Sequence, residues 1–142
     1  MDAVAPRQPS SRYGLFLTAP RALELRDLSL PPLTRGEALV RVAGCGLCHT
    51  DIGFYSGAVR TKHDLPLVLG HEIAGVVEDV AGPAGHLIGR QVLVPAVMPC
   101  GECDLCLNGR QLACQHQRMP GNDIAGGFAT HIVVPANMLV PL

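Results

Sequence analysis

Four cysteines in the run CGECDLCLNGRQLAC constrain this chain more than any other feature. They are separated by two, two and seven residues and lie at Cys100, Cys103, Cys106 and Cys114. A tetrahedral zinc site takes four thiolates at about 2.3 Å, and short CxxC turns followed by a longer loop let four sulfur atoms converge on one ion. Because four protein ligands leave no open position for water or substrate, we predict a structural zinc site in a lobe of about residues 97–118.

Disulfide bonds are the alternative use of closely spaced cysteines. Such frameworks are typical of short secreted chains, but the N-terminal stretch MDAVAPRQPSSRYG shows no apolar signal-peptide region and no cleavage-site pattern. Bonds between adjacent CxxC cysteines would also close very small loops, which restrict an unfolded chain little. Zinc is therefore our interpretation.

Composition excludes several classes of protein. The chain has 142 residues, of which 48% are hydrophobic and 16% charged, as in a single globular domain. Its net charge is −1 and Lys62 is its only lysine, so no basic stripe suits a nucleic acid and no basic amphipathic face suits a membrane. No apolar run approaches the roughly 20 residues of a transmembrane helix. We expect a cytoplasmic protein.

Short apolar stretches that end at Gly, Pro or Asp predict many short strands and few helices. The expected strands cover Tyr13–Thr18, Ala22–Asp27, Glu37–Ala43, Ile73–Val80, Gln91–Val94 and Phe128–Val134. One short helix is expected from Thr50 to Tyr55, and residues 1–12 are expected to form a flexible arm. This pattern favours a mainly β fold, a closed or partly open β-barrel from which the cysteine-rich lobe projects.

Two other segments carry residues suited to catalysis. The segment GCGLCHTD contains Cys48, and the segment LGHE contains His71. A thiolate and an imidazole would supply two of the three protein ligands of a catalytic zinc site, which keeps its remaining position open. A zinc ion with an open position polarises a bound alcohol and lowers the pKa of its hydroxyl group.

The neighbours of these two residues predict supporting roles. The Thr50 hydroxyl would pass the alcohol proton towards solvent, Asp51 would accept the free ring N–H of His71, and Glu72 would act on the ion electrostatically. Simpler interpretations stand beside these. Thr50 and Asp51 would also serve to cap a short helix, and a single cysteine or histidine is often a core residue. Cys45 and Cys48 form a CxxC typical of dithiol redox pairs, although no βαβ pattern surrounds it.

Taken in order, the segments GCGLCHTD, LPLVLGHEIAGVVEDV, IGRQVLVPA, CGECDLCLNGRQLAC and GGFATHIVVPA resemble the N-terminal, GroES-like domain of zinc-dependent medium-chain alcohol dehydrogenases. The resemblance covers residues 13–142. It implies a GroES-like, partly open β-barrel with a projecting zinc lobe, in an enzyme that oxidises a secondary alcohol to a ketone with NAD or NADP.

The resemblance also implies roles for individual residues. Cys48 and His71 match the catalytic zinc ligands, Thr50 the proton-relay hydroxyl, Asp51 the carboxylate behind the ligand histidine, and Glu72 the acidic residue beside the zinc. The four lobe cysteines Cys100, Cys103, Cys106 and Cys114 match the structural zinc ligands.

The chain departs from the family pattern in two places. Many members have a histidine shortly after the relay hydroxyl, where this chain has Ile52 and Gly53. Members also continue into a Rossmann domain that binds NAD or NADP and adds the third zinc ligand, whereas no GxGxxG follows a strand here. We therefore expect a fragment that contains no cofactor-binding residues, holds structural zinc, holds catalytic zinc weakly and transfers no hydride alone. The full-length protein is expected to be a homo-oligomer.

A narrower resemblance rests on the segments AGCGLCHTDIGFY, VPAVMPC, QRMPGND and HIVVPA. They are similar to the 6-hydroxycyclohex-1-ene-1-carbonyl-CoA dehydrogenases, which implies a cyclic hydroxyacyl-CoA substrate. Two alternatives stay open. One is a non-catalytic zinc-stabilised β-module for interaction or assembly, and the other is a zinc-free reductase on the same barrel, whose members usually lack the cysteine-rich lobe.

Overall fold

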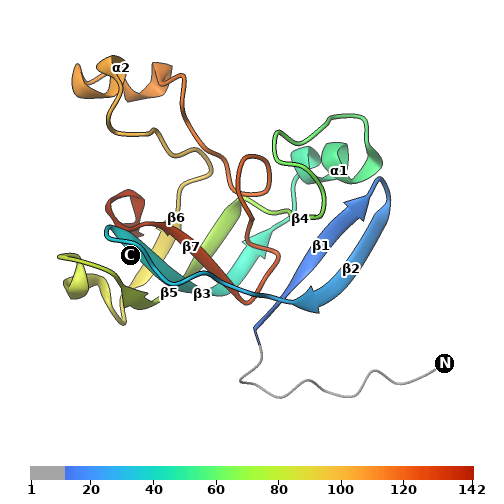
Figure 1. Cartoon of the computed structure of the whole chain (residues 1–142), viewed down its shortest axis with the longest axis horizontal. Coiled ribbons are helices and arrows are strands. Elements are labelled where there is room, and N and C mark those ends of the chain that lie inside the picture. Colours follow the sequence, from blue (N-terminus) through green and yellow to red (C-terminus); the bar gives the residue numbers. More distant parts are fainter. Residues whose placement is uncertain (1–11) are drawn as a thin grey trace.

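The computed structural model describes residues 12–142 and is mainly β, as expected (Figure 1). The expected arm at residues 1–12 lies outside this part apart from Arg12. The strands are β1 (Tyr13–Ala19), β2 (Ala22–Asp27), β3 (Glu37–Gly46), β4 (Leu67–Val68), β5 (Glu72–Val80), β6 (Gln91–Val94), β7 (His131–Pro135) and β8 (Val140–Pro141). The helices are α1 (His49–Ser56), α2 (Asp104–Leu107) and the 3-10 turns η1 (Gly85–Leu87), η2 (Gln111–Ala113) and η3 (Ala136–Met138).

Alternation of buried and exposed side chains explains why the central segments form strands. In β6 every second residue is buried, and β7 follows the same period. Successive side chains of a strand point to opposite faces, so this pattern places one face of the sheet against the core. The buried positions are filled by branched apolar residues such as Val92, Val94, Ile132 and Val134.

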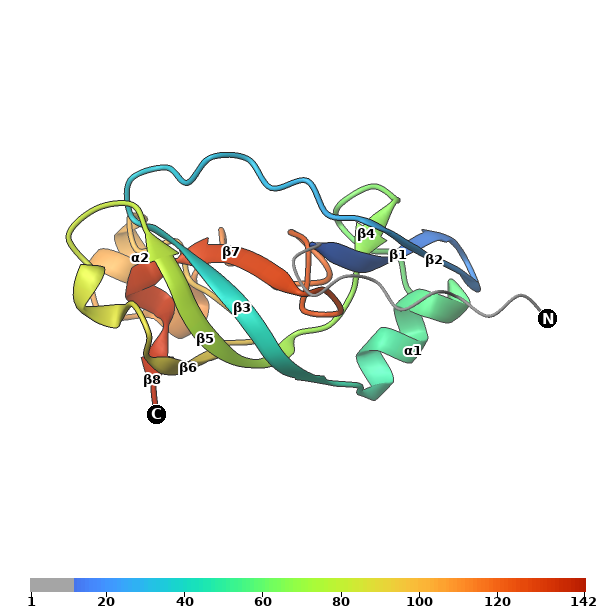
Figure 2. The same ribbon diagram turned by 90° about the horizontal axis from the view of Figure 1, so that it is seen from below.

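The strands form two sheets that are not closed into a complete barrel. The larger sheet has the order β7-β3-β5-β6-β8, and the smaller has the order β2-β1-β4. All pairings between these strands are antiparallel. Figure 2 shows the long strands β3 and β5 running side by side, with the β1–β2 hairpin and α1 at the other end of the molecule. The partly open barrel expected from the sequence is thus confirmed.

The two sheets meet at the segment that precedes β7. The amide of Leu15 donates to the carbonyl oxygen of Phe128 at 2.8 Å, and the amide of Thr130 donates to the carbonyl oxygen of Tyr13 at 2.9 Å. A large apolar core lies over the five-stranded sheet. A smaller cluster of Leu17, Phe54, Leu67 and Leu69 joins α1 to the smaller sheet and lies close to the predicted catalytic residues.

Helix α1 confirms the expected short helix and extends it by one residue at each end. Its buried side chains are Asp51 and Phe54, which are three residues apart and therefore share one helix face. The helix ends at Gly57, whose φ of 79° is the left-handed conformation common after the last turn. This helix therefore places one carboxylate, beside the apolar side chain of Phe54, against the interior.

The elements missed at the sequence level are very short. Strands β4 and β8 contain two residues each, and α2 contains four. Such segments carry too few residues for a periodic pattern to be recognised. Strand β7 also begins at His131 rather than at Phe128, because residues 126–128 bond to the loop after β4 instead. Within residues 12–142, the helices are all too short or too polar to cross a membrane.

Candidate metal centres

The pairing of β3 with β5 brings the two predicted catalytic ligands together. In this antiparallel ladder Gly46 lies opposite Glu72. Cys48 is two residues beyond Gly46, and His71 is one residue before Glu72, so both fall at the same end of the sheet. The Cys48 Sγ and His71 Nε2 atoms lie 3.2 Å apart. The strand register thus brings together two residues that are 23 positions apart in the sequence.

The donor set at this point fits a metal ion of the zinc type. Ligand atoms of Cys48, Asp51 and His71 lie within 4.8 Å of one another. A sulfur and an imidazole nitrogen bound to one tetrahedral zinc would be separated by about 3.6 Å, close to the spacing found here. His71 is 7% exposed, and its Nδ1 atom is a buried polar atom without a hydrogen-bond partner in the described structure. A half-buried thiol and a buried imidazole held this close together are suited to binding a cation.

Asp51 organises the loops that carry both ligands. Its side chain is 2% exposed. The Oδ2 atom accepts a hydrogen bond from the backbone amide of Cys48 at 3.0 Å, and the Oδ1 atom accepts one from the amide of Gly70 at 3.2 Å. The same Oδ1 lies 3.6 Å from His71 Nδ1, just beyond hydrogen-bond range. The structure therefore places the carboxylate behind the histidine, and the bond between them stays a prediction.

Replacing Asp51 by asparagine should weaken metal binding at this centre without removing either ligand. The amide keeps most of the shape but loses the negative charge that favours an Nδ1–H on His71. A lost carboxylate partner typically lowers metal affinity by about 10- to 100-fold. Competition of the loaded chain with a chelator measures the change. The exposed Asp79 is the matched control, and equal affinities in Asp51→Asn and Asp79→Asn would contradict the role of Asp51.

Thr50 and Glu72 both lie near the centre but are exposed. Thr50 is an exposed residue on the first turn of α1, two positions after Cys48. The Glu72 carboxylate lies against the α-carbon of Gly46, where a side chain on Gly46 would collide with it. Glu72 is not among the residues whose ligand atoms cluster; in the described structure the acidic member of that cluster is Asp51.

The CxxC formed by Cys45 and Cys48 lacks the features of a dithiol redox pair. Both thiols are free in the structure. Burial raises the pKa of the Cys45 thiol to about 11, and nearby acidic groups, Asp51 first, raise it further against a hydrogen bond from the Glu72 amide. A reactive cysteine needs a lowered pKa to be a thiolate at neutral pH. Cys45 is thus a packed side chain at the end of β3.

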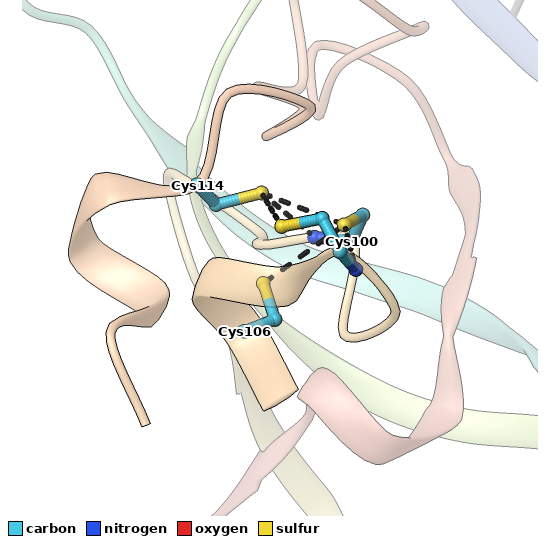
Figure 3. A group of neighbouring side chains, drawn as sticks. Cys100, Cys106 and Cys114 are labelled. Carbon is cyan, nitrogen blue, oxygen red and sulfur yellow. Dashed lines mark hydrogen bonds between the residues drawn. The ribbon is translucent and has the colours of Figure 1, made fainter. Parts of the chain in front are cut away.

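The four cysteines of the lobe converge as predicted. The lobe is closed at its base by two hydrogen bonds between the backbones of Met98 and Arg118, of 2.8 and 2.9 Å. Figure 1 shows it projecting from the sheets with α2 at its tip. The side chains of Cys100, Cys106 and Cys114 point into one space in Figure 3. The ligand atoms of all four cysteines, including Cys103, lie within 4.8 Å of one another.

The sulfur spacing matches a metal site and not a disulfide. The Sγ of Cys100 lies 3.9 Å from that of Cys106 and 3.6 Å from that of Cys114, and the Cys103 and Cys114 sulfurs are 3.9 Å apart. Four sulfurs at about 2.3 Å from a tetrahedral ion would be about 3.8 Å apart. A disulfide bond is about 2.05 Å long. All six cysteines of the chain are free in the structure.

Backbone amides in the lobe stabilise the thiolate form of Cys100. Hydrogen bonds from the amides of Glu102 and then Cys103 lower the pKa of the Cys100 thiol to about 6. Burial has the opposite effect on Cys106 and raises the pKa of its thiol to about 12. Without a cation in the cluster, Cys106 would stay protonated at neutral pH. A bound zinc ion would supply the charge that holds all four residues as thiolates.

An apolar cavity beside α1 was not anticipated from the sequence. It has a volume of about 360 Å³, and Asp51 is the charged residue among the described residues that line it. Leu47 and Ile52 line it and are 68% and 48% exposed. One sequence feature pointed to this cavity: the apolar Ile52 lies in the stretch where many family members have a histidine.

Comparison with known proteins agrees with this geometry. The family profile described as alcohol dehydrogenase GroES-like domain matches residues 34–142. An alcohol dehydrogenase of Geobacillus stearothermophilus is 38% identical over 124 residues, which are 86% of this chain and 37% of that protein. An NAD-dependent alcohol dehydrogenase of Sulfolobus acidocaldarius is 35% identical over 119 residues, which are 80% of this chain and 35% of that protein.

A solved structure shows the same fold. A candidate zinc-binding dehydrogenase of Sinorhizobium meliloti, bound to NADP, superposes with a TM-score of 0.81 at 27% identity, over 94% of this chain and 39% of that one. The chain belongs to the family of alcohol dehydrogenase GroES-like domains. It spans little more than a third of the length of the curated relatives it matches.

Proposed function

We propose that this chain is the N-terminal, metal-binding domain of a zinc-dependent alcohol dehydrogenase linked to NAD or NADP. The observation that carries the proposal is the cluster of half-buried Cys48 with buried Asp51 and His71, which is separate from the four-cysteine lobe. A module that needed zinc only for stability would not require a second group of metal-binding side chains. The names of the relatives, which include an NAD-dependent alcohol dehydrogenase and a candidate zinc-binding dehydrogenase bound to NADP, support the choice of cofactors.

Each residue of the proposed catalytic centre has a distinct part. Cys48 and His71 would hold the zinc ion, and the bound ion would supply the Lewis acidity that makes an alcohol hydroxyl acidic. Asp51 would orient His71 so that the Nε2 lone pair faces Cys48. The exposed Thr50 hydroxyl would exchange the proton with water, and Glu72 would add negative charge at the rim. A third protein ligand and the NAD(P) site would come from outside these residues.

Metal content tests the proposal directly. The chain is expected to bind two zinc ions, one tightly in the lobe and one more weakly at Cys48 and His71. Elemental analysis after dialysis against low zinc would give about two equivalents, and brief chelation would remove the second ion first. A stoichiometry of one, with only the four-sulfur centre filled, would favour the non-catalytic β-module instead.

For the substrate, we propose a secondary alcohol that is oxidised to a ketone, with a cyclic hydroxyacyl-CoA thioester as the specific candidate. The support is the loop-segment resemblance alone, and the relatives described above are alcohol dehydrogenases by name. Comparing kcat/KM of the native polypeptide for 6-hydroxycyclohex-1-ene-1-carbonyl-CoA and for simple alcohols tests this candidate. A preference for ethanol or threonine would remove it and leave the family assignment intact.

We also propose that the complete protein is a homo-oligomer in a reducing compartment, the cytoplasm in a bacterium. Six free thiols in one chain are typical of such a compartment. The lobe presents two large apolar side chains to solvent, Leu107 at 71% exposure and Leu112 at 100%, as subunit contacts often do. Sedimentation of the native polypeptide measures its oligomeric state, and a monomer would contradict the proposal.

A further inference from the structure

The loop that carries His71 is clasped by a second loop, residues 119–128, that contributes no side chain to the Cys48–Asp51–His71 cluster. Three successive amides of residues 126–128 donate hydrogen bonds to the carbonyl oxygens of residues 68–70, at 2.8 to 2.9 Å. Here the contact reaches the residue immediately before the proposed metal ligand.

Two glycines allow the backbones to approach this closely. A Cβ atom on Gly126 would overlap the carbonyl oxygen of Gly70 and lie 2.5 Å from that of Leu69. A Cβ atom on Gly121 would lie 2.7 Å from the Gly70 amide nitrogen. Real Cβ atoms essentially never approach other atoms within 3.0 Å. Any side chain at Gly126 must therefore push the loop of residues 119–128 and the backbone that leads into His71 apart.

The clasping loop is itself tied to the chain on its other side. The Asp123 carboxylate accepts the amide of Met119 at 2.9 Å and pairs with Lys62 Nζ at 3.3 Å. The Asn122 side-chain oxygen accepts a hydrogen bond from the backbone amide of Lys62 at 2.9 Å. The backbone carbonyl oxygen of Asn122 accepts one from the amide of His63 at 2.8 Å. Because these bonds shape the turn at residues 119–123, the loop acts as a preformed support.

We propose that residues 119–128 are a positioning element for the metal ligand His71, with Gly126 as its closest point of contact. The inference rests on the proposed function, since it requires a metal ion at Cys48 and His71. Its physical basis is that Gly70 donates its amide to Asp51, so displacing Gly70 moves both the ligand and the carboxylate behind it. A metal centre tolerates displacements of only about 0.5 Å in its ligands.

The test is a cobalt titration of the 142-residue chain carrying Gly126→Ala. Cobalt(II) bound by four sulfurs and cobalt(II) bound by sulfur and nitrogen have different visible spectra, so the two centres are followed separately. We expect affinity at the Cys48–His71 centre to fall by about tenfold or more, with affinity in the lobe unchanged. Gly85→Ala is the matched control, because a Cβ atom on Gly85 would meet nothing within 4 Å.

The outcomes separate this inference from the proposed function. If the unaltered chain binds one cobalt ion, in the lobe, the proposed function is wrong and the inference falls with it. If the unaltered chain binds two ions and Gly126→Ala binds both equally well, only the positioning role is overturned. Should Gly126→Ala lose the circular dichroism of the native fold, Asp123→Ala decides the matter, because it loosens the supporting turn and adds no atom at the contact. Unchanged affinity in that variant overturns the positioning role as well.

Discussion

Replacing Cys48 by alanine is expected to remove the more weakly bound zinc ion and to lower the turnover of the complete enzyme, with its NAD(P) site, by at least about 100-fold. The same result is expected for His71→Ala. Zinc with an open position stabilises developing charge by several kcal/mol, and each 1.36 kcal/mol corresponds to a factor of ten in rate. A centre that has lost its sulfur or its imidazole would retain too few ligands to hold the ion.

Metal analysis and steady-state kinetics with an alcohol and NAD or NADP measure both parts of this prediction. Cys45→Ala is the matched control, because Cys45 is a half-buried cysteine three residues away that contributes no ligand atom to the cluster. It should keep two zinc ions and most of the activity. Full activity in Cys48→Ala, with zinc confined to the lobe, would refute a catalytic role for the Cys48–His71 centre.

Cys103→Ser is expected to empty the lobe and lower the melting temperature by about 10 °C or more. Zinc binding by a small metal-stapled segment is also folding free energy, so losing one of four ligands releases the whole loop. The lobe has few other contacts to hold it. Its helix α2 has four residues, and Leu112 beside its metal cluster is fully exposed. Loss of the lobe should also reduce the oligomer content if Leu107 and Leu112 contact another subunit.

Calorimetry and zinc analysis of the 142-residue chain test this second prediction, with Cys45→Ser as the control for loss of a thiol elsewhere. Because the lobe is closed by the Met98–Arg118 backbone pair, the sheets should remain folded and keep their far-ultraviolet circular dichroism. Melting and assembly identical to the unaltered chain would argue against a structural role for the lobe.

The positions of the longer strands could be predicted because they depend on local pattern. The expected boundaries of Ala22–Asp27 and Gln91–Val94 are those of β2 and β6. Strand β3 continues three residues further than expected, to Gly46, since its end is a bulged ladder with β5 that no periodicity reveals. Strands of two residues such as β4 exist only because a neighbouring strand is present to accept their hydrogen bonds.

The amino-acid sequence by itself determined the lobe, because ligands that are two, two and seven residues apart meet through short turns whatever the rest of the chain does. It also identified Cys48 and His71 as a pair, although nothing local connects them. Tertiary structure alone decided how they meet, through the register that sets Gly46 opposite Glu72. It also decided that Asp51, buried between the two loops, is the carboxylate in the cluster while Glu72 stays at the rim. The physical reason is that ligand spacing is a property of a short segment, whereas distances between segments depend on sheet register and on glycines that let two backbones touch.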